Sequence, residues 1–500
     1  MTRTLLALLL CLSLFWANGQ VQNNPFNRTY FPAKKSWATG TDQVKIGGET
    51  IEYTVEAQYL PLGSEEGATR ARVFYTAYTR SEVEDPTQRP ITFVFNGGPG
   101  SSSVWLHMGG LGPKRVNMND DGSPVAPPYG YSDNPHSWLD LTDLVFIDPM
   151  MTGYTRPAEE ADKEDFLGFQ QDLELVGQFI QVYLSENKRW GSPKFLAGES
   201  YGTTRAAGLS GYLQNRYGLY LNGITLISAV MDFSTLIDVR GNDLAPLTVL
   251  PTMAATAWYH GQASEEFESL EDLLKEVEEF VMGDYALALL QGDRLTGELE
   301  EKVIDRLHAF TGLDTSYLAD VHCRLSVGAF NKELLRSQGV TVGRLDSRFK
   351  GVDYQNAGES YDYDPSYNRT IYGPFTAAIY DYLGREIGVE INIPYEILTG
   401  RARPWPYGEA ASNQYLNVAE TLRQAMTHNP DMKVWVASGY YDMATPYFAT
   451  EYTLDHMFLA EGLRENIMST YYPAGHMMYI HKPSLEQLKQ DAERFYEGAY

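Results

Sequence analysis

Ser200 lies between two glycines in the pentapeptide GESYG, residues 198–202, where a short apolar run meets the start of a helical pattern. Because glycine has no Cβ, a strand and a helix can approach closely on either side of this serine, and the sharp turn lifts its hydroxyl above the sheet. The N-terminus of the following helix would bring the Tyr201 backbone N–H to the same place. This pattern favours a nucleophilic serine over an ordinary turn serine.

A serine hydroxyl is a weak nucleophile, so Ser200 requires a base that takes its proton. A strand, a sharp turn and a helix around Gly-x-Ser-x-Gly are typical of α/β-hydrolases, in which an acid and then a histidine follow the serine along the chain. His476 follows a short apolar strand pattern, in a loop that contains a glycine. His481 is the alternative, although it comes where the last helix is expected to start. We therefore predict that His476 is the general base.

The acid is expected after the strand that precedes the histidine segment. The apolar run 434–437 leads into the loop GYYDM, residues 439–443. Asp442 in this loop would fix the tautomer of His476 and stabilise the imidazolium. Asp455 falls in the next helical stretch and is a poorer candidate, and an exposed or helix-capping aspartate is the alternative interpretation of Asp442.

Backbone donors are expected in a glycine-rich loop, residues 96–103 with the sequence NGGPGSSS, which follows an apolar strand ending at Phe95. Consecutive glycines let backbone N–H groups face a reacting carbonyl. A tetrahedral intermediate needs two such donors, and we assign them to Gly98 and Tyr201. The alternative is that this stretch is only a Gly/Pro turn.

The elements that must position these residues alternate along the chain. Short apolar runs are expected to form strands, namely 91–95, 144–147, 195–197, 221–230 and 434–437. An amphipathic helix is predicted over 164–187. The alternation predicts the α/β class, and with the serine corner it predicts an α/β-hydrolase fold, a mostly parallel central sheet flanked by helices.

The segment 241–406 interrupts this alternation with acidic helical stretches and a loop rich in Tyr and Asp. We predict that it is a largely helical inserted cap region. The expected organisation is then a signal peptide over 1–19, a first part of the hydrolase core over 20–240, this cap region, and a second part of the core over 407–500.

The first residues predict export from the cytoplasm. Arg3 precedes an apolar run from Leu5 to Trp16, small residues follow it, and the run is too short to span a bilayer comfortably. We therefore expect a cleaved signal peptide and a secreted or periplasmic protein without stable membrane insertion; a membrane anchor is the alternative. The mature chain would keep one cysteine, Cys323, and form no internal disulfide.

The composition limits the classes of partner that the protein can bind. A net charge of −26 argues against nucleic-acid binding, because a nucleic acid would be repelled by such a surface. We expect no metal and no other cofactor, and the oligomeric state stays open.

Taken together, the motifs resemble those of the serine carboxypeptidases, a branch of the α/β-hydrolases. The matching stretches occur in the family's order over most of the chain: FNGGPGSS at 95–102, GP at 112–113, DP at 148–149, GESYG at 198–202, GYYD at 439–442 and GHM at 475–477. The segment 250–261 and the lack of disulfides resemble bacterial members in particular. The resemblance implies an exopeptidase that removes one residue from the C-terminus of a peptide.

Such an enzyme has to recognise a free α-carboxylate next to the scissile bond. The Asn96 side-chain amide and the Gly97 backbone N–H are expected to donate to it. Glu199 would repel the carboxylate if it were ionised, but burial beside Ser200 should raise its pKa, and the protonated acid can donate a hydrogen bond. Activity is then expected to be highest at acidic pH. A surface glutamate without this role is the alternative.

Two positions depart from the family pattern. Many members carry cysteine where this chain has Ser101, and a second glutamate where it has Gly110. The serine costs no catalytic group. Without the second acid, the pKa of Glu199 loses one influence that raises it, so the acid preference is expected to be weaker.

Two other functions fit parts of the pattern. The triad alone does not select amides over esters, so an esterase or acyltransferase on the same scaffold is the runner-up. A non-catalytic secreted binding protein is the other possibility, and the presence of all three triad candidates argues against it. We therefore predict a secreted serine carboxypeptidase whose partners are peptides with a free C-terminus.

Overall fold

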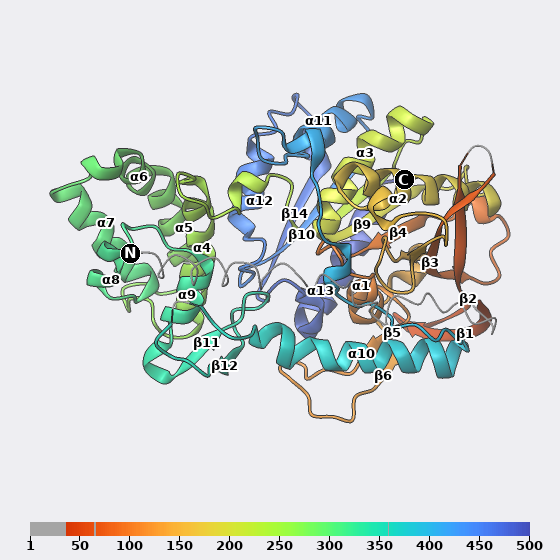
Figure 1. The fold of residues 1–500 in the computed structure, drawn as a ribbon, viewed down its shortest axis with the longest axis horizontal. Helices are drawn as coiled ribbons and strands as arrows, with labels where there is room; N and C mark the ends of the chain where they lie inside the picture. The colour runs from red at the N-terminus through yellow and green to blue at the C-terminus, as the bar shows by residue number, and fades with distance from the viewer. Residues whose placement is uncertain (1–36, 65–66, 359) are drawn as a thin grey trace, which may run out of the picture.

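The computed structural model describes residues 37–64, 67–358 and 360–500, and a ten-stranded sheet runs through it (Figure 1). Its strands lie in the order β1 (Ala38–Ile46), β2 (Glu49–Gly63), β3 (Thr69–Arg80), β7 (Asp143–Ile147), β4 (Ile91–Phe95), β9 (Lys194–Ser200), β10 (Gly223–Ala229), β13 (Lys433–Gly439) and β14 (Ile467–Tyr472), and β8 (Arg156–Pro157) pairs with β3. The pairs from β1 to β7 are antiparallel, and those from β7 to β14 are parallel. The carboxyl ends of the parallel strands therefore share one edge, where ligands bind in open α/β sheets.

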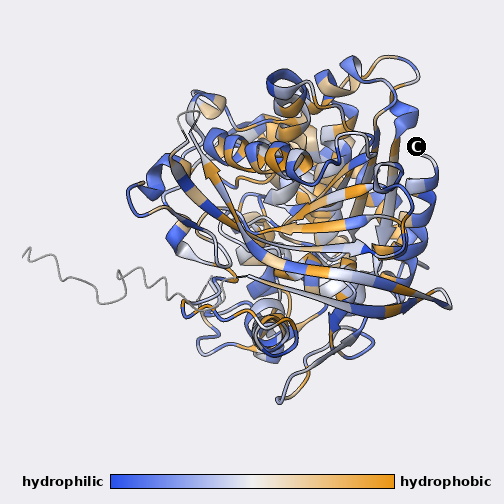
Figure 2. Cartoon of the chain, turned by 90° about the vertical axis from the view of Figure 1, so that its right-hand side faces the viewer, coloured by the Kyte–Doolittle hydropathy of each residue, from blue (hydrophilic) through white to orange (hydrophobic). Residues whose placement is uncertain are grey.

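The central strands are apolar on both faces because both faces of the sheet are covered. In β4, Phe93 and Phe95 pack into one apolar core, and Val94 packs into the other. Figure 2 shows the orange of apolar residues along the middle strands and alternating blue and orange on the surrounding helices. Strands that are buried on both faces have continuous apolar sequences, so these strands could be predicted from their apolar runs.

Helices lie on both sides of this sheet. One core contains side chains of α2 (Phe169–Glu186), α3 (Tyr201–Tyr217), α11 (Ala419–His428) and α12 (Tyr447–Asp455). The other contains side chains of α1 (Val104–Leu106), α10 (Tyr372–Asp381) and α13 (Lys482–Glu497). This is the predicted α/β-hydrolase architecture, a mostly parallel sheet flanked by helices.

The helix predicted over 164–187 is shorter than expected. Residues 163–166 form a separate 3-10 turn, and α2 begins only after Gly168. The φ of Gly168 is 122°, which lies outside the helical region, so the backbone cannot continue as one helix through this residue.

Between β10 and β13 the chain forms two further parts. The first is a group of helices with a core of their own beside the sheet, drawn in green in Figure 1: α4 (Leu244–Tyr259), α5 (Leu270–Phe280), α6 (Ala286–Gln291), α7 (Glu298–Thr311), α8 (Thr315–Asp320) and α9 (Val327–Glu333). The second contains the ribbon of β11 (Val340–Val342) and β12 (Lys350–Val352) and continues into α10, which packs back on the sheet's core. Beside α10 lies a second small ribbon of β5 (Lys114–Val116) and β6 (Tyr131–Asp133).

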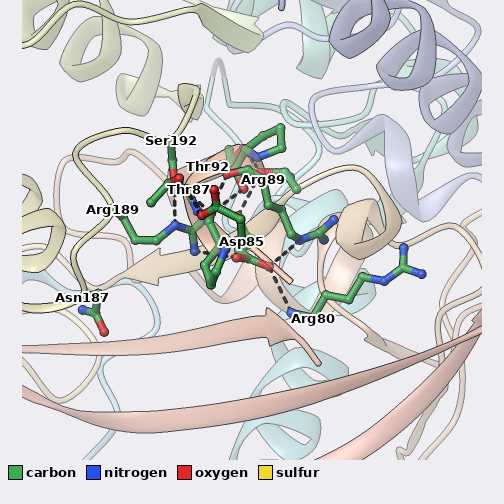
Figure 3. Close-up of polar contacts among 12 residues, drawn as sticks. Arg80, Asp85, Thr87, Arg89, Thr92, Asn187, Arg189 and Ser192 are labelled. Atoms are coloured by element: carbon green, nitrogen blue, oxygen red, sulfur yellow. Dashed lines mark hydrogen bonds and ion pairs between the residues drawn. The ribbon is translucent and has the colours of Figure 1, made fainter. Parts of the chain in front are cut away.

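The amino ends of the parallel strands are tied together by a buried ion cluster around Asp143. Arg89 Nε donates to one carboxylate oxygen of Asp143 at 2.7 Å, and Arg189 Nη1 donates to the other at 2.6 Å. Arg189 also donates to Ser192 Oγ at 2.6 Å and to the carbonyl oxygen of Arg89 at 2.8 Å (Figure 3). The segments that enter β4, β7 and β9 are thus joined at the edge opposite the strands' carboxyl ends.

The predicted signal peptide, residues 1–19, lies outside the described residues. Within the described part of the chain, no helix combines the length and the apolar character that crossing a membrane requires.

Candidate active site

Ser200 lies at the end of β9 in a backbone conformation that few residues other than glycine adopt. Its φ is 61° and its ψ is −131°. Such strain persists only where the surrounding structure holds it, and it clusters at functional sites. A Cβ on Gly198 would lie only 2.2 Å from the carbonyl oxygen of Gly202, so glycine is required for this close approach. Because α3 begins at Tyr201, the structure contains the strand–turn–helix corner that the pentapeptide predicted.

Asp442 follows β13, His476 follows β14, and the two side chains meet. His476 Nδ1 lies 2.7 Å from Asp442 Oδ2. The other carboxylate oxygen accepts the backbone N–H groups of Ala444 and Thr445 at 2.8 and 3.0 Å, and the Thr445 hydroxyl donates to Oδ2 at 2.7 Å. A carboxylate held in this way places the proton on Nδ1 and leaves Nε2 as the acceptor.

Two opposing influences act on the protonation of His476. Burial lowers its pKa, but the charge of Asp442 and the hydrogen bond to it outweigh burial, so the pKa is raised. The imidazole is therefore a stronger base than an exposed histidine, as proton abstraction from a serine requires.

Ser200 and His476 line one cavity of about 390 Å³ at the carboxyl edge of the sheet. Among the described residues, the Ser200 hydroxyl is not hydrogen-bonded to the imidazole. Catalytic hydrogen bonds are often long before substrate binds and tighten in the complex. The structure thus brings the three residues to one end of the sheet, and the transfer of a proton between Ser200 and His476 stays a prediction.

The two loops with the predicted oxyanion donors pack backbone against backbone. A Cβ on Gly97 would lie 2.4 Å from the backbone nitrogen of Tyr201. Gly98 lines the cavity beside Ser200 and has a φ of 106°. Side chains are thus excluded from the space around the predicted donors, Gly98 and Tyr201, whose role in binding an oxyanion stays a prediction.

Glu199 lines the same cavity and is only 3% exposed. Burial raises its pKa to about 7, against the lowering effects of His476 and of a hydrogen bond from Tyr479. The Tyr479 hydroxyl donates this bond to Glu199 Oε2, and its own pKa is far above the usual value because of burial and the charge of Glu199. Glu199 therefore carries a proton in a large fraction of molecules near neutral pH and can then donate a hydrogen bond to an anion.

Asn96 contributes a buried donor without a partner. The residue is 1% exposed, and its Oδ1 accepts the backbone N–H of Leu106 at 3.1 Å. Its Nδ2 lies close enough to Glu199 to lower the pKa of that carboxyl, but it meets the distance and angle of a hydrogen bond with no acceptor in the described part of the chain. Buried polar groups are nearly always paired, so an unpaired amide in a cavity wall marks a place for an acceptor. Arg205 Nη1 holds the Asn96 backbone by donating to its carbonyl oxygen at 2.7 Å.

Tyr479 packs against Gly110, the position where the resemblance to the serine carboxypeptidases led us to expect a second glutamate. A Cβ on Gly110 would lie 3.0 Å from Tyr479 Cβ, and one on Gly109 would lie 2.4 Å from Tyr479 Cε2. The tyrosine leaves little space for a side chain at these two positions, and its hydroxyl supplies the hydrogen bond to Glu199. Its effect on Glu199 is opposite to that of a neighbouring acid, because a donor favours the ionised form. Nothing in the apolar stretch after His476 singled this residue out.

The loop that carries His476 is held by residues that sequence reasoning also missed. The His476 N–H donates to Leu345 O at 2.6 Å, and the Gly475 N–H donates to Asp346 Oδ2 at 3.1 Å. Asp346 is itself paired with Arg348 at 2.6 Å. These residues belong to the segment between β11 and β12 and form no recognisable motif, so only the folded chain reveals them.

Known proteins share parts of this sequence. A family model described as serine carboxypeptidase matches residues 48–480. The pheromone-processing carboxypeptidase KEX1 of Saccharomyces cerevisiae is 31% identical over 159 residues, which are 29% of this chain and 20% of KEX1. Carboxypeptidase Y of Candida albicans is 30% identical over 119 residues, which are 23% of this chain and 19% of that protein. The chain thus aligns with about a fifth of the length of these curated relatives.

Among solved structures, the crystal structure of Kex1(delta)p, a prohormone-processing carboxypeptidase from Saccharomyces cerevisiae, covers 89% of this chain and 91% of its own. The TM-score is 0.54 and the sequence identity is 16%, so this likeness supports the fold. Since the family model spans the serine corner, the glycine-rich loop and the aspartate and histidine loops together, the chain belongs to the serine carboxypeptidase family.

Proposed function

We propose that this protein is a secreted or periplasmic serine carboxypeptidase that hydrolyses the C-terminal peptide bond of peptides. Ser200 is the nucleophile, His476 is the general base and acid, and Asp442 orients the imidazole. The observation that carries the proposal is the pair of buried donors beside Ser200: the unpartnered Asn96 Nδ2 and Glu199, whose pKa burial raises to about 7. Such a pair suits the free carboxylate of a peptide C-terminus.

The reaction proceeds through an acyl-enzyme. Ser200 Oγ attacks the scissile carbonyl while His476 Nε2 takes its proton, and the backbone N–H groups of Gly98 and Tyr201 stabilise the oxyanion. His476 then gives the proton to the leaving amino acid, and water hydrolyses the ester on Ser200 by the same steps. Asp442 stays ionised and stabilises the imidazolium.

Recognition of the substrate end depends on protonation. Asn96 Nδ2 and the Gly97 N–H donate to the α-carboxylate, and protonated Glu199 adds a third hydrogen bond. An ionised Glu199 would face the substrate anion with a like charge, so binding weakens as this residue loses its proton. We further propose that the predicted inserted region, 241–406, supplies much of the cavity wall, because Arg344, Leu398 and Arg403 line it.

The test compares a blocked dipeptide that has a free C-terminus with the same dipeptide as its C-terminal amide. We expect release of the last residue from the free acid, at least about a hundredfold faster in kcat/KM than cleavage of the amide, because the buried donors lose their acceptor. Equal cleavage of both, or a preference for simple esters, would instead favour the esterase on the same scaffold.

A further inference from the structure

The cavity around Ser200 is lined by two arginines that have no acidic partner. Arg344 and Arg403 are both exposed, and within the described part of the chain neither guanidinium forms an ion pair. This is unexpected in a protein with 65 acidic and 39 basic residues. The Asp364 carboxylate near Arg344 accepts its backbone N–H at 3.2 Å and is otherwise bonded to Ser366.

Arg344 lies close to the reacting groups. It lines the cavity together with Ser200 and His476. The pKa of His476 is lowered mainly by burial and raised by Asp442. The charge of Arg344 adds a smaller lowering effect, which shows that it acts on the imidazole. Among the described residues that line this cavity, Glu199 alone carries a carboxylate, and the proposed function assigns it to the C-terminus of the substrate.

Arg344 also lines a second cavity of about 400 Å³, which shares Ala444 with the first. The second lining is largely apolar and includes Phe233, Leu236 and Val249. None of Asn96, Gly97 and Glu199 lines it. If the last residue of a peptide is anchored by those three groups, the residues before the scissile bond extend away from them. Arg344 lines both cavities, so a peptide that extends from the first cavity to the second would pass it.

We propose that the enzyme selects peptides with an acidic side chain immediately before the scissile bond, and that Arg344 binds this side chain. The inference rests on the proposed function. A guanidinium offers a planar fork of donors that matches a carboxylate, and no carboxylate of the described residues is paired with that of Arg344. In the described lining of the second cavity Asp238 is the one carboxylate, so an acidic side chain placed further from the scissile bond is disfavoured.

The experiment measures kcat/KM at pH 6 for blocked dipeptides that share a C-terminal leucine and differ in the preceding residue, Glu, Gln or Lys. Glu and Gln have the same shape, so their ratio isolates the charge, and a glutamate side chain is ionised at this pH. We expect Glu to exceed Gln about tenfold and to lose part of that advantage as salt rises. Arg344→Met should bring the ratio close to one, and Arg344→Glu should favour Lys.

The matched control is Lys350→Met, which removes one exposed cation from a cavity that contains neither Ser200 nor His476. It should leave the ratio of Glu to Gln unchanged. Equal rates for Glu and Gln in the parent enzyme would overturn the inference while leaving the carboxypeptidase intact. A ratio that survives Arg344→Met but is lost in Arg403→Met would overturn the assignment to Arg344. If no peptide releases its last residue, the proposed function itself fails.

Discussion

The two edges of the parallel strands both hold buried polar and charged groups, but they leave those groups in opposite states. At the amino edge, one carboxylate oxygen of Asp143 accepts a hydrogen bond from Arg89 and the other accepts one from Arg189. At the carboxyl edge, Asn96 Nδ2 is buried without a partner and burial raises the pKa of Glu199 to about 7. A fully paired cluster stabilises the segments that it joins, whereas unpaired donors in a cavity wall can bind a ligand.

The comparison predicts that variants at the two edges separate activity from stability. Carboxyl-edge variants should lose turnover and keep the fold, and amino-edge variants should do the reverse.

The largest effect is expected for Ser200→Ala. Removing the nucleophile should lower kcat by about a millionfold, since the remaining triad members act only through it. Release of a C-terminal residue from a blocked dipeptide measures the effect, and a thermal melt within about 2 °C of the parent shows that the fold is intact. Turnover near the parent rate would mean that another group attacks the carbonyl.

Asp442→Asn should come next, with a loss of about ten-thousandfold in kcat. The amide can offer His476 a donor instead of an acceptor, which favours the wrong tautomer and no longer stabilises the imidazolium. Steady-state kinetics at several pH values measure it. A loss of less than about tenfold would show that the 2.7 Å contact with His476 Nδ1 orients no catalytic base.

The opposite edge is tested by Asp143→Asn. The substitution leaves two nearly buried arginines without a countercharge, so we expect the free energy of unfolding to fall by about 3 kcal/mol. Chemical denaturation measures this loss, and kcat/KM per folded molecule should stay within about twofold of the parent. As the control, Asp165→Asn removes an acid from the exposed pair with Arg70 and should cost less than about 1 kcal/mol. A specific loss of turnover in Asp143→Asn would break the comparison.

The smallest effect is expected for Tyr479→Phe, and it concerns pH. Protonated Glu199 is the binding form, so kcat/KM should fall on the alkaline side as pH rises through the pKa of about 7. Tyr479 donates to the ionised form; without its hydroxyl the pKa of Glu199 rises, and the alkaline limb should move up by about one pH unit. Glu199→Gln is the reference, because a neutral amide removes this limb altogether. An unmoved limb in both variants would exclude Glu199 as the group that titrates.

Some residues of the site could be predicted from the sequence and others could not. Ser200, Asp442 and His476 could be proposed because each follows an apolar strand pattern and the chain order limits the choice. Gly98 and Gly198 carry a local steric requirement, because a Cβ on either would meet backbone atoms of the same short motif. These features depend on neighbours along the chain.

The remaining parts depend on contacts between distant segments. Tyr479 reads as an apolar core residue until its ring is seen against Gly109 and Gly110. Leu345 and Asp346 brace the loop of His476 from the ribbon segment, and no spacing links them to it. The sequence predicts too early a start for α2, because the helical spacing of apolar side chains continues through residues 163–168. The backbone of Gly168 is not helical, so the helix begins after it.

The central claim is that the carboxyl edge activates Ser200, and covalent labelling tests it most directly. A fluorophosphonate probe reacts with an activated serine, and peptide mass mapping identifies the labelled residue. The account predicts one label per chain on the peptide that contains Ser200, and no label in Ser200→Ala or after heat denaturation. A label on another residue, or an unlabelled protein that still releases C-terminal residues, would contradict it.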